Sequence, residues 1–310
     1  MVRLNRPPRL PTLHEVRHAI QNIDVRFPIT LFTALALSVP LAAQEQKKEP
    51  PRYTITDLGT LGGTFSDVGG VNNEGTVSGF STLPGDTVTH AFLWQRGQMT
   101  DLGTLGGPDS RAPEASPPND RSEVAGFSDT SNPDPNGEDF CGLGTNLICL
   151  PFLWQKGVMT PLPTLGGNNA EANGINSRGE VGGQAETPNL DLCSPFFLQV
   201  EAVIWRDGQI QQVLPPLGGS VGVVNAINDN GQAVGIVGIA GCVTGNLHAV
   251  LWQRRTPIDL GNLGGVTNNF AFAINNRGQA IGQSDLPGDT AAHAFLWTEE
   301  DGIQDTFVSF

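Results

Sequence analysis

The sequence predicts an all-β protein, a β-propeller of five four-stranded blades. Three short phrases recur along the 310 residues: a segment ending in tryptophan, Leu-Gly-Gly, and Asn-x-x-Gly. Successive tryptophans are 60, 51, 47 and 45 residues apart, and a repeat of this length is typical of stacked or circular arrays. The 39 glycines and 23 prolines, with 15% charged residues, favour many short strands joined by turns.

Each tryptophan ends a short apolar segment that is typical of a β-strand. The five segments end at Trp94, Trp154, Trp205, Trp252 and Trp297, which we predict to be the repeated core residues. A glycine follows three residues later in the first three copies, at Gly97, Gly157 and Gly208. This glycine predicts a tight hairpin with a bulge, whose second strand runs on to Leu-Gly-Gly.

The Asn-x-x-Gly phrase predicts a second hairpin in each unit, because asparagine favours the first position of a type I turn and glycine the fourth. It occurs at 72–75, 176–179, 228–231 and 275–278. The second copy, at 119–122, lacks the glycine and follows prolines 113, 117 and 118, so the second blade is expected to be the weakest. Two hairpins per unit supply the four strands of one blade.

The two ends of the repeat region offer two ways to complete the fifth blade. Residues Tyr53–Leu58 match the second half of a hairpin whose first half is a tryptophan strand, so they could pair with the last one. The tail Asp305–Val308 could take that place instead. The alternative fold is an open β-solenoid, in which the first and last units would not touch.

The first 52 residues differ from the repeats. Five arginines lie within residues 1–27, and the apolar run Pro28–Ala43 then ends in Leu41-Ala42-Ala43, as in a secretory signal peptide or an uncleaved anchor over residues 1–43. Residues 44–52 form a polar linker, and the propeller domain spans 53–310. We therefore expect a secreted, periplasmic or cell-surface protein.

An exported chain with an even number of cysteines is expected to form disulfides. All four cysteines lie in the variable loops, and Cys141–Cys149 is the favoured pair because it closes a small loop. Cys193 and Cys242 fall in equivalent loops of neighbouring units and could bridge them. A zinc site is disfavoured, because there is no Cys-x-x-Cys pair.

Charge excludes one class of partner. Without residues 1–43, 12 basic and 29 acidic residues remain, a net charge of −17, which repels nucleic acid. No cofactor is expected. The phrase Leu-Pro-Gly-Asp-Thr places Asp86 and Asp289 in equivalent loops, where a tight turn is the favoured interpretation and calcium the weaker one.

Taken together, the phrases His-Ala-Phe-Leu-Trp, Asp-Leu-Gly-Thr-Leu-Gly-Gly and Ile-Asn-x-x-Gly resemble a bacterial family, the HAF-repeat extracellular proteins. The resemblance covers residues 53 to about 304. It implies export and a propeller-like array but no chemistry. Copies two and three depart from the pattern, with Leu-Pro-Phe and Glu-Ala-Val in place of His-Ala-Phe.

Catalytic chemistry is not evident in the sequence. His90, His248 and His293 occupy one repeat position and would meet only if they faced the axis, and no nucleophile–base pair is apparent. We predict a non-catalytic, monomeric binding or scaffold module. Its ligand, a cell-envelope glycan or a protein, would bind the face that carries the insertions 129–148 and 186–200. The alternative is a propeller glycan hydrolase or lyase.

Overall fold

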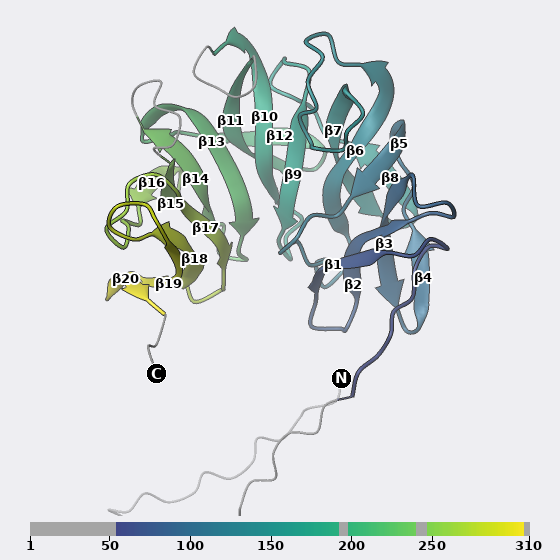
Figure 1. Ribbon diagram of the computed structural model, residues 1–310, viewed down its shortest axis with the longest axis horizontal. Helices are drawn as coiled ribbons and strands as arrows, with labels where there is room; N and C mark the ends of the chain where they lie inside the picture. The colour runs from purple at the N-terminus through teal and green to yellow at the C-terminus, as the bar shows by residue number, and fades with distance from the viewer. Residues whose placement is uncertain (1–53, 192–197, 240–246, 307–310) are drawn as a thin grey trace, which may run out of the picture. The chain divides into compact units, whose positions relative to one another are not determined.

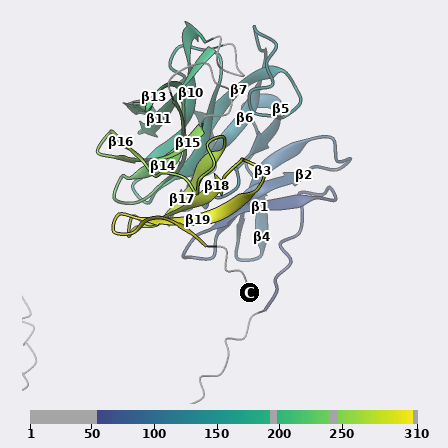
Figure 2. The ribbon, with the colours of Figure 1, turned by 60° about the vertical axis from the view of Figure 1, so that its left-hand side comes forward.

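The computed structural model describes residues 54–191, 198–239 and 247–306, and it confirms the five-bladed propeller. Each blade is a four-stranded antiparallel sheet made of consecutive strands, and the blades follow one another around a common centre (Figure 1). The turned view brings the fifth blade, in yellow and yellow-green, to the front (Figure 2). The open solenoid is therefore excluded. The segments 1–43 and 44–52, together with Cys193 and Cys242, lie outside the described residues.

The strands of a blade run from the centre outward in chain order. Blades 1 and 2 contain β1 (Ser66–Val71), β2 (Val77–Thr82), β3 (Thr89–Gln95), β4 (Gln98–Asp101), β5 (Gly106–Arg111), β6 (Val124–Pro133), β7 (Leu147–Gln155) and β8 (Val158–Pro161). Blades 3 to 5 contain β9 (Ala170–Ile175), β10 (Val181–Leu190), β11 (Leu198–Arg206), β12 (Gln209–Leu214), β13 (Gly218–Ile227), β14 (Ala233–Ile239), β15 (Leu247–Gln253), β16 (Thr256–Asp259), β17 (Asn269–Ile274), β18 (Ala280–Asp285), β19 (Ala292–Thr298) and β20 (Gly302–Asp305).

The hairpin after each tryptophan strand differs from the prediction in two respects. In blade 1, Arg96 and Gly97 have φ of 52° and 85°, so both lie in the left-handed region and close a two-residue turn without a bulge. The predicted bulge is therefore wrong here. The fourth strand also ends before Leu-Gly-Gly. The phrase leads into the next blade, where the Leu105 N–H donates to Ser128 Oγ at 2.9 Å, and in blades 2 and 4 its glycines already belong to the first strand.

The predicted Asn-x-x-Gly turns are confirmed. The Gly75 N–H donates to the Asn72 carbonyl at 3.1 Å, and the same bond recurs from Gly179 to Asn176 at 3.0 Å. In blade 2 the prolines predicted to weaken the first strand lie beyond its end at Arg111, as their missing N–H groups require.

Apolar clusters between consecutive blades form the core. Trp205 and Trp252 are almost completely buried, and their indole N–H groups donate to the carbonyls of Pro163 and Pro215 at 2.8 Å. Trp297 is 8% exposed, whereas Trp94 and Trp154 are half-buried. All five tryptophans therefore occupy equivalent third-strand positions, with burial deepest in blades 3 and 4.

The fifth blade is completed by the C-terminal strand. β20 pairs with β19, so the strand that completes the blade comes from the C-terminal end, but it precedes most of the predicted tail and includes only its first residue, Asp305. Residues 54–65 form no strand. Within residues 54–191, 198–239 and 247–306 there is no helix long and apolar enough to cross a membrane.

Candidate functional site

The inner strands of the five blades surround a central cavity of about 790 Å³. Every blade contributes to its wall, through Phe80, Arg111, Glu171, Val223 and Phe272 in blade order. A concave space with a mixed apolar and polar lining is the expected form of a small-ligand site. We therefore take this cavity, called the channel below, as the candidate site.

Aromatic side chains dominate the apolar part of the channel. Phe80, Phe127 and Phe272 line it, and Phe272 is 42% exposed. The guanidinium carbon of Arg111 lies 4.7 Å from the centre of the Phe80 ring, a cation–π arrangement. Arg111 Nε is buried and has no hydrogen-bond partner in the described part of the chain. Phe272 and the half-buried Phe80 therefore present ring surface to the channel, whereas Phe127 is only 5% exposed.

Blade 3 contributes a hydrogen-bonded pair of polar side chains to the wall. Gln184 Nε2 donates to the Glu171 carboxyl at 2.7 Å, and burial raises the pKa of Glu171 to about 7. Asn173 and Asn225 also line the channel, but their amide nitrogens are used to join blades, donating to the carbonyls of Val224 at 3.0 Å and Ala271 at 2.8 Å. Glu171 and Gln184 thus remain as the polar pair that can orient a ligand.

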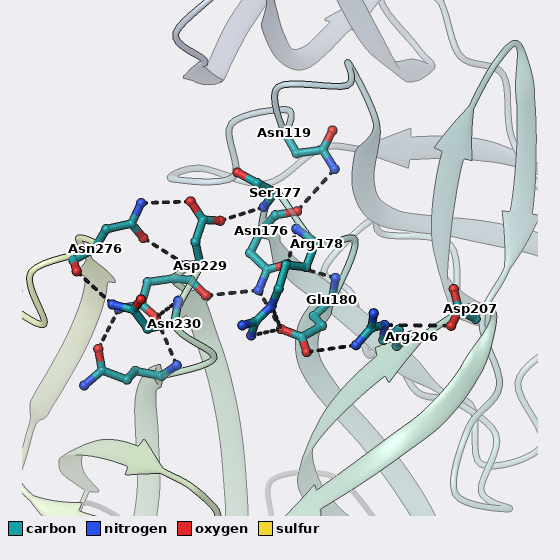
Figure 3. A network of polar contacts seen from close by, with 12 residues as sticks. Asn119, Asn176, Ser177, Arg178, Glu180, Arg206, Asp207, Asp229, Asn230 and Asn276 are labelled. Carbon is teal, nitrogen blue, oxygen red and sulfur yellow. Dashed lines mark hydrogen bonds and ion pairs between the residues drawn. The ribbon is translucent and has the colours of Figure 1, made fainter. Parts of the chain in front are cut away.

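A relay of asparagines joins the turns between the first and second strands of neighbouring blades, and Figure 3 shows its part around Asn119 and Asn176. In blades 1 to 4 the turn asparagine donates from Nδ2 to the carbonyl of the next turn asparagine. These bonds run from Asn72 to Asn119 at 2.9 Å, to Asn176 at 3.2 Å, to Asn228 at 3.0 Å and to Asn275 at 2.9 Å. The same asparagines accept two backbone N–H groups of their own turn at Oδ1. One side chain therefore stabilises its own turn and also links two neighbouring blades by a hydrogen bond.

A second layer of polar contacts supports the relay in blades 3 to 5 (Figure 3). Asp229 accepts the Ser177 N–H at 2.8 Å and an Asn276 amide N–H at 2.8 Å, and these bonds lower its pKa against the opposing effect of burial. Arg178 pairs with Glu180 at 2.5 Å. The turns at this end are consequently tied into one network.

The insertions lie at the opposite end from the asparagine turns, because they connect the second and third strands of antiparallel blades. They are shorter than predicted, since β6, β7, β10 and β11 extend into them. The predicted disulfide between Cys141 and Cys149 is present. It ties the first insertion to β7, so this insertion is a braced part of the rim.

A buried carboxyl lies beneath these insertions. Glu186 is fully buried, and Oε2 accepts the N–H groups of Asn168 at 3.0 Å and Asn169 at 2.8 Å. Burial and the nearby carboxylates of Glu138 and Asp134 nevertheless raise the pKa of Glu186 to about 7. Glu186 is therefore a proton-binding group of the folded state.

We expect stability to fall as the pH rises from about 4.5 to about 7. Over this range the unfolded chain has already released the Glu186 proton, whereas the folded protein still holds it, and above about 7 the stabilisation is lost. Glu186→Gln should weaken this dependence and raise Tm at pH 8 by a few degrees. Thermal unfolding at pH 4.5, 6 and 8 measures it. Glu74→Gln, in an exposed turn, is the control, and an unchanged pH profile in Glu186→Gln would contradict the assignment.

The histidines do not converge on a shared site. Each bonds an aspartate on the neighbouring fourth strand: His90 with Asp101 at 2.8 Å, His248 with Asp259 at 2.7 Å, and His293 with Asp305 at 2.7 Å. The Asp101 hydrogen bond raises the pKa of His90. These pairs therefore join the two outer strands of their blades.

Asp86 and Asp289 adopt the predicted tight turns, with φ of 56° and 54°. Asp86 accepts the Thr64 N–H at 2.7 Å and Asp289 the Val266 N–H at 2.8 Å, and such bonds lower the pKa of both carboxyls. In the described part of the chain, no three histidine, cysteine, aspartate or glutamate side chains gather closely enough to hold a metal ion.

Sequence reasoning missed the channel residues Arg111, Glu171 and Gln184. They occupy a place where the copies differ: the facing pairs of the first two strands are Asp67–Phe80, Arg111–Phe127, Glu171–Gln184 and Val223–Ile236. A position that varies within an otherwise regular repeat is the signal that could have found them.

No known protein family matches this chain, and no curated protein matches it either.

Proposed function

We propose that the protein is an exported, non-catalytic binding module that holds a neutral oligosaccharide, such as a cell-envelope glycan, in its channel. The observation that carries the proposal is the mixed wall, with the rings of Phe80 and Phe272 in the same channel as the Glu171–Gln184 pair. Aromatic rings stack on the apolar faces of sugars, while amides and carboxyls bond hydroxyl groups. The first insertion, braced by the Cys141–Cys149 disulfide, would contact the part of a glycan that projects from the channel.

Charge supports a neutral ligand. The chain has a net charge of −14, and the channel wall itself carries Arg111 against Glu114 and Glu171. A polyanion would meet unfavourable potential on approach, whereas a neutral sugar would not. Export and the resemblance to HAF-repeat proteins agree with a ligand outside the cell and remain predictions.

The first experiment is a printed array of bacterial cell-envelope oligosaccharides probed with the purified full chain. Binding of at least one neutral oligosaccharide is expected. Calorimetry with that sugar should show Kd raised about tenfold by Phe272→Ala, because one stacking contact of this kind contributes about 1.4 kcal/mol. Val158→Ala, an exposed change on the outer strand β8, is the matched control and should leave Kd unchanged.

The same assay separates the competing functions. Glu171→Gln should lower the affinity for the sugar, and the wild type should bind the sugar without cleaving it. Release of new reducing ends by the wild type would instead favour the alternative function, a glycan hydrolase. Binding that survives Phe272→Ala and Glu171→Gln, but is lost when residues 135–145 are deleted, would assign the ligand to the insertions and contradict the channel proposal.

A further inference from the structure

Four of the five spaces between blades share one buried residue, the leucine that follows the fourth strand. These leucines are between 2% and 6% exposed and belong to the four apolar clusters that join consecutive blades; they are Leu102, Leu162, Leu214 and Leu260. The Leu102 N–H donates to the Ala91 carbonyl at 3.0 Å, and the Leu260 N–H donates likewise to Ala249. A leucine in this position is therefore part of every packed interface.

The interface between blade 5 and blade 1, called the seam below, lacks this residue. After β20 the equivalent position is Thr306, whose N–H donates to the Ala294 carbonyl at 3.1 Å but whose side chain is exposed. Among the described residues, no apolar cluster joins blade 5 to blade 1. The seam is thus unpacked where the other four interfaces are packed.

The two faces of the seam carry apolar side chains that are covered in the other blades. Val68 is 47% exposed, while its equivalents Ala112, Ala172, Val224 and Ala271 are all at 0%. Ile281 is 52% exposed, while the equivalent Val234 is at 0%. Both faces therefore present surface that the repeat elsewhere buries against a neighbouring blade.

The asparagine relay also stops at the seam. Asn275 Nδ2 bonds Gln279 of its own turn at 2.8 Å, and within the described residues it has no bond to blade 1. Asn72, whose carbonyl is the next acceptor in the pattern, borders the same hollow of about 300 Å³ as Asn275. Donor and acceptor thus face a common space without meeting.

The chain contains a second segment that matches the fourth strand of blade 5. Ile55-Thr56-Asp57-Leu58-Gly59 repeats the pattern of Met99-Thr100-Asp101-Leu102-Gly103. Asp57 Oδ1 accepts the Gly59 N–H at 2.9 Å, as Asp101 accepts the Gly103 N–H at 2.8 Å. Ile55 is nevertheless fully exposed, and the segment pairs with no strand.

We propose that the outer edge of β19 is a docking surface for residues Ile55–Leu58 of the same chain. This segment exchanges with β20 by displacing it from β19, and its docking closes the seam. Docking places Asp57 opposite Phe295, in the position that Asp305 has now and within reach of His293, and it brings Leu58 to the interface position that Thr306 fills with a polar side chain. Blade 5 then packs on blade 1, so that Ile281 and Val68 are covered and Asn275 reaches Asn72. The fifth interface acquires the features of the other four.

Cysteine trapping in the full chain tests the exchange. The register of β3 with β4 pairs Leu93 with Thr100, so docking pairs Leu296 with Thr56, whereas the β20 arrangement pairs Leu296 with Gln304. The double variant Thr56→Cys, Leu296→Cys should form an intrachain disulfide in most molecules, identified by peptide mass spectrometry. The pair Leu296→Cys, Gln304→Cys reports the arrangement in which β20 is docked.

Matched substitutions check that the leucine drives docking. Adding Leu58→Asn to the Thr56→Cys, Leu296→Cys variant should lower the cross-linked fraction at least threefold. Adding Thr60→Asn should not, because Asn262 fills the equivalent position in another link. The proposal is overturned if the first double variant forms no disulfide while the Leu296→Cys, Gln304→Cys variant is completely cross-linked. A disulfide of the first variant found only between two chains overturns it as well, since it would show exchange between copies.

Hydrogen exchange of the unmodified chain provides a readout that needs no substitution. The amides of residues 56–58 are expected to exchange at least tenfold more slowly than in an unstructured peptide. Unprotected amides in residues 56–58, together with full protection of β20, would contradict the proposed docking of this segment on β19. This result would hold even if a cysteine variant failed to fold.

Discussion

Replacing Asn176 by aspartate should destabilise the propeller by about 2–4 kcal/mol. An aspartate keeps the Oδ1 acceptor for the Arg178 and Glu180 N–H groups. It loses the donor to the Asn228 carbonyl and places a second carboxylate against Glu180, at a site only 4% exposed. Burying an unpaired charge beside another carboxylate carries a penalty of this size. Urea unfolding at pH 7 measures the loss.

Asn262→Asp is the matched control for this prediction. Asn262 serves as an acceptor, taking the Gly264 N–H at 2.9 Å, and an aspartate retains that role. We expect its unfolding free energy to change by less than about 0.5 kcal/mol. Equal losses in both variants would mean that the relay between blades contributes nothing beyond the turn itself.

Gly235→Ala should destabilise by about 3 kcal/mol or more. Gly235 lies in the second strand of blade 4, and a Cβ there would lie 1.9 Å from the Val223 carbonyl oxygen. The clash is with backbone, so the two inner strands must separate to relieve it, and overpacking of this kind is costly. Thermal unfolding of the variant, or its failure to accumulate as folded protein, measures the effect.

Gly238→Ala in the same strand tests whether the effect is positional. A Cβ at Gly238 would meet its nearest neighbour, Val221 Cβ, at 3.7 Å, an ordinary contact. This variant should unfold within about 0.5 kcal/mol of the wild type. The prediction for Gly235 is wrong if the two alanine variants are equally stable.

The repeated residues made the architecture predictable. The tryptophan segments and the Asn-x-x-Gly turns encode strands and turns locally, and their fivefold recurrence fixes the number of blades. What the phrases do between blades was not predictable from local rules. Asn176 was expected as a turn residue, and its bond to Asn228 joins residues 52 positions apart. Leu-Gly-Gly was predicted to lie in a strand. Its role in leading from one blade to the next could not be predicted, because that role depends on where the next blade lies.

The residues of the candidate site were less predictable than the fold, because they lie outside the repeated phrases. Glu171 and Arg111 belong to no repeated phrase, and each has an ordinary strand context in the sequence. Their grouping arises only when five inner strands converge on one axis. The glycine equivalent to Gly235 recurs in every blade, yet the close approach of the first strand that demands it appears only in the assembled sheet.

Amide hydrogen exchange with and without the array-selected oligosaccharide tests the channel assignment most directly. Added protection is expected in the inner strands β5, β9, β13 and β17 and in the adjacent β2 and β10. Protection confined to residues 129–148, with these strands unchanged, would contradict the channel as the binding site.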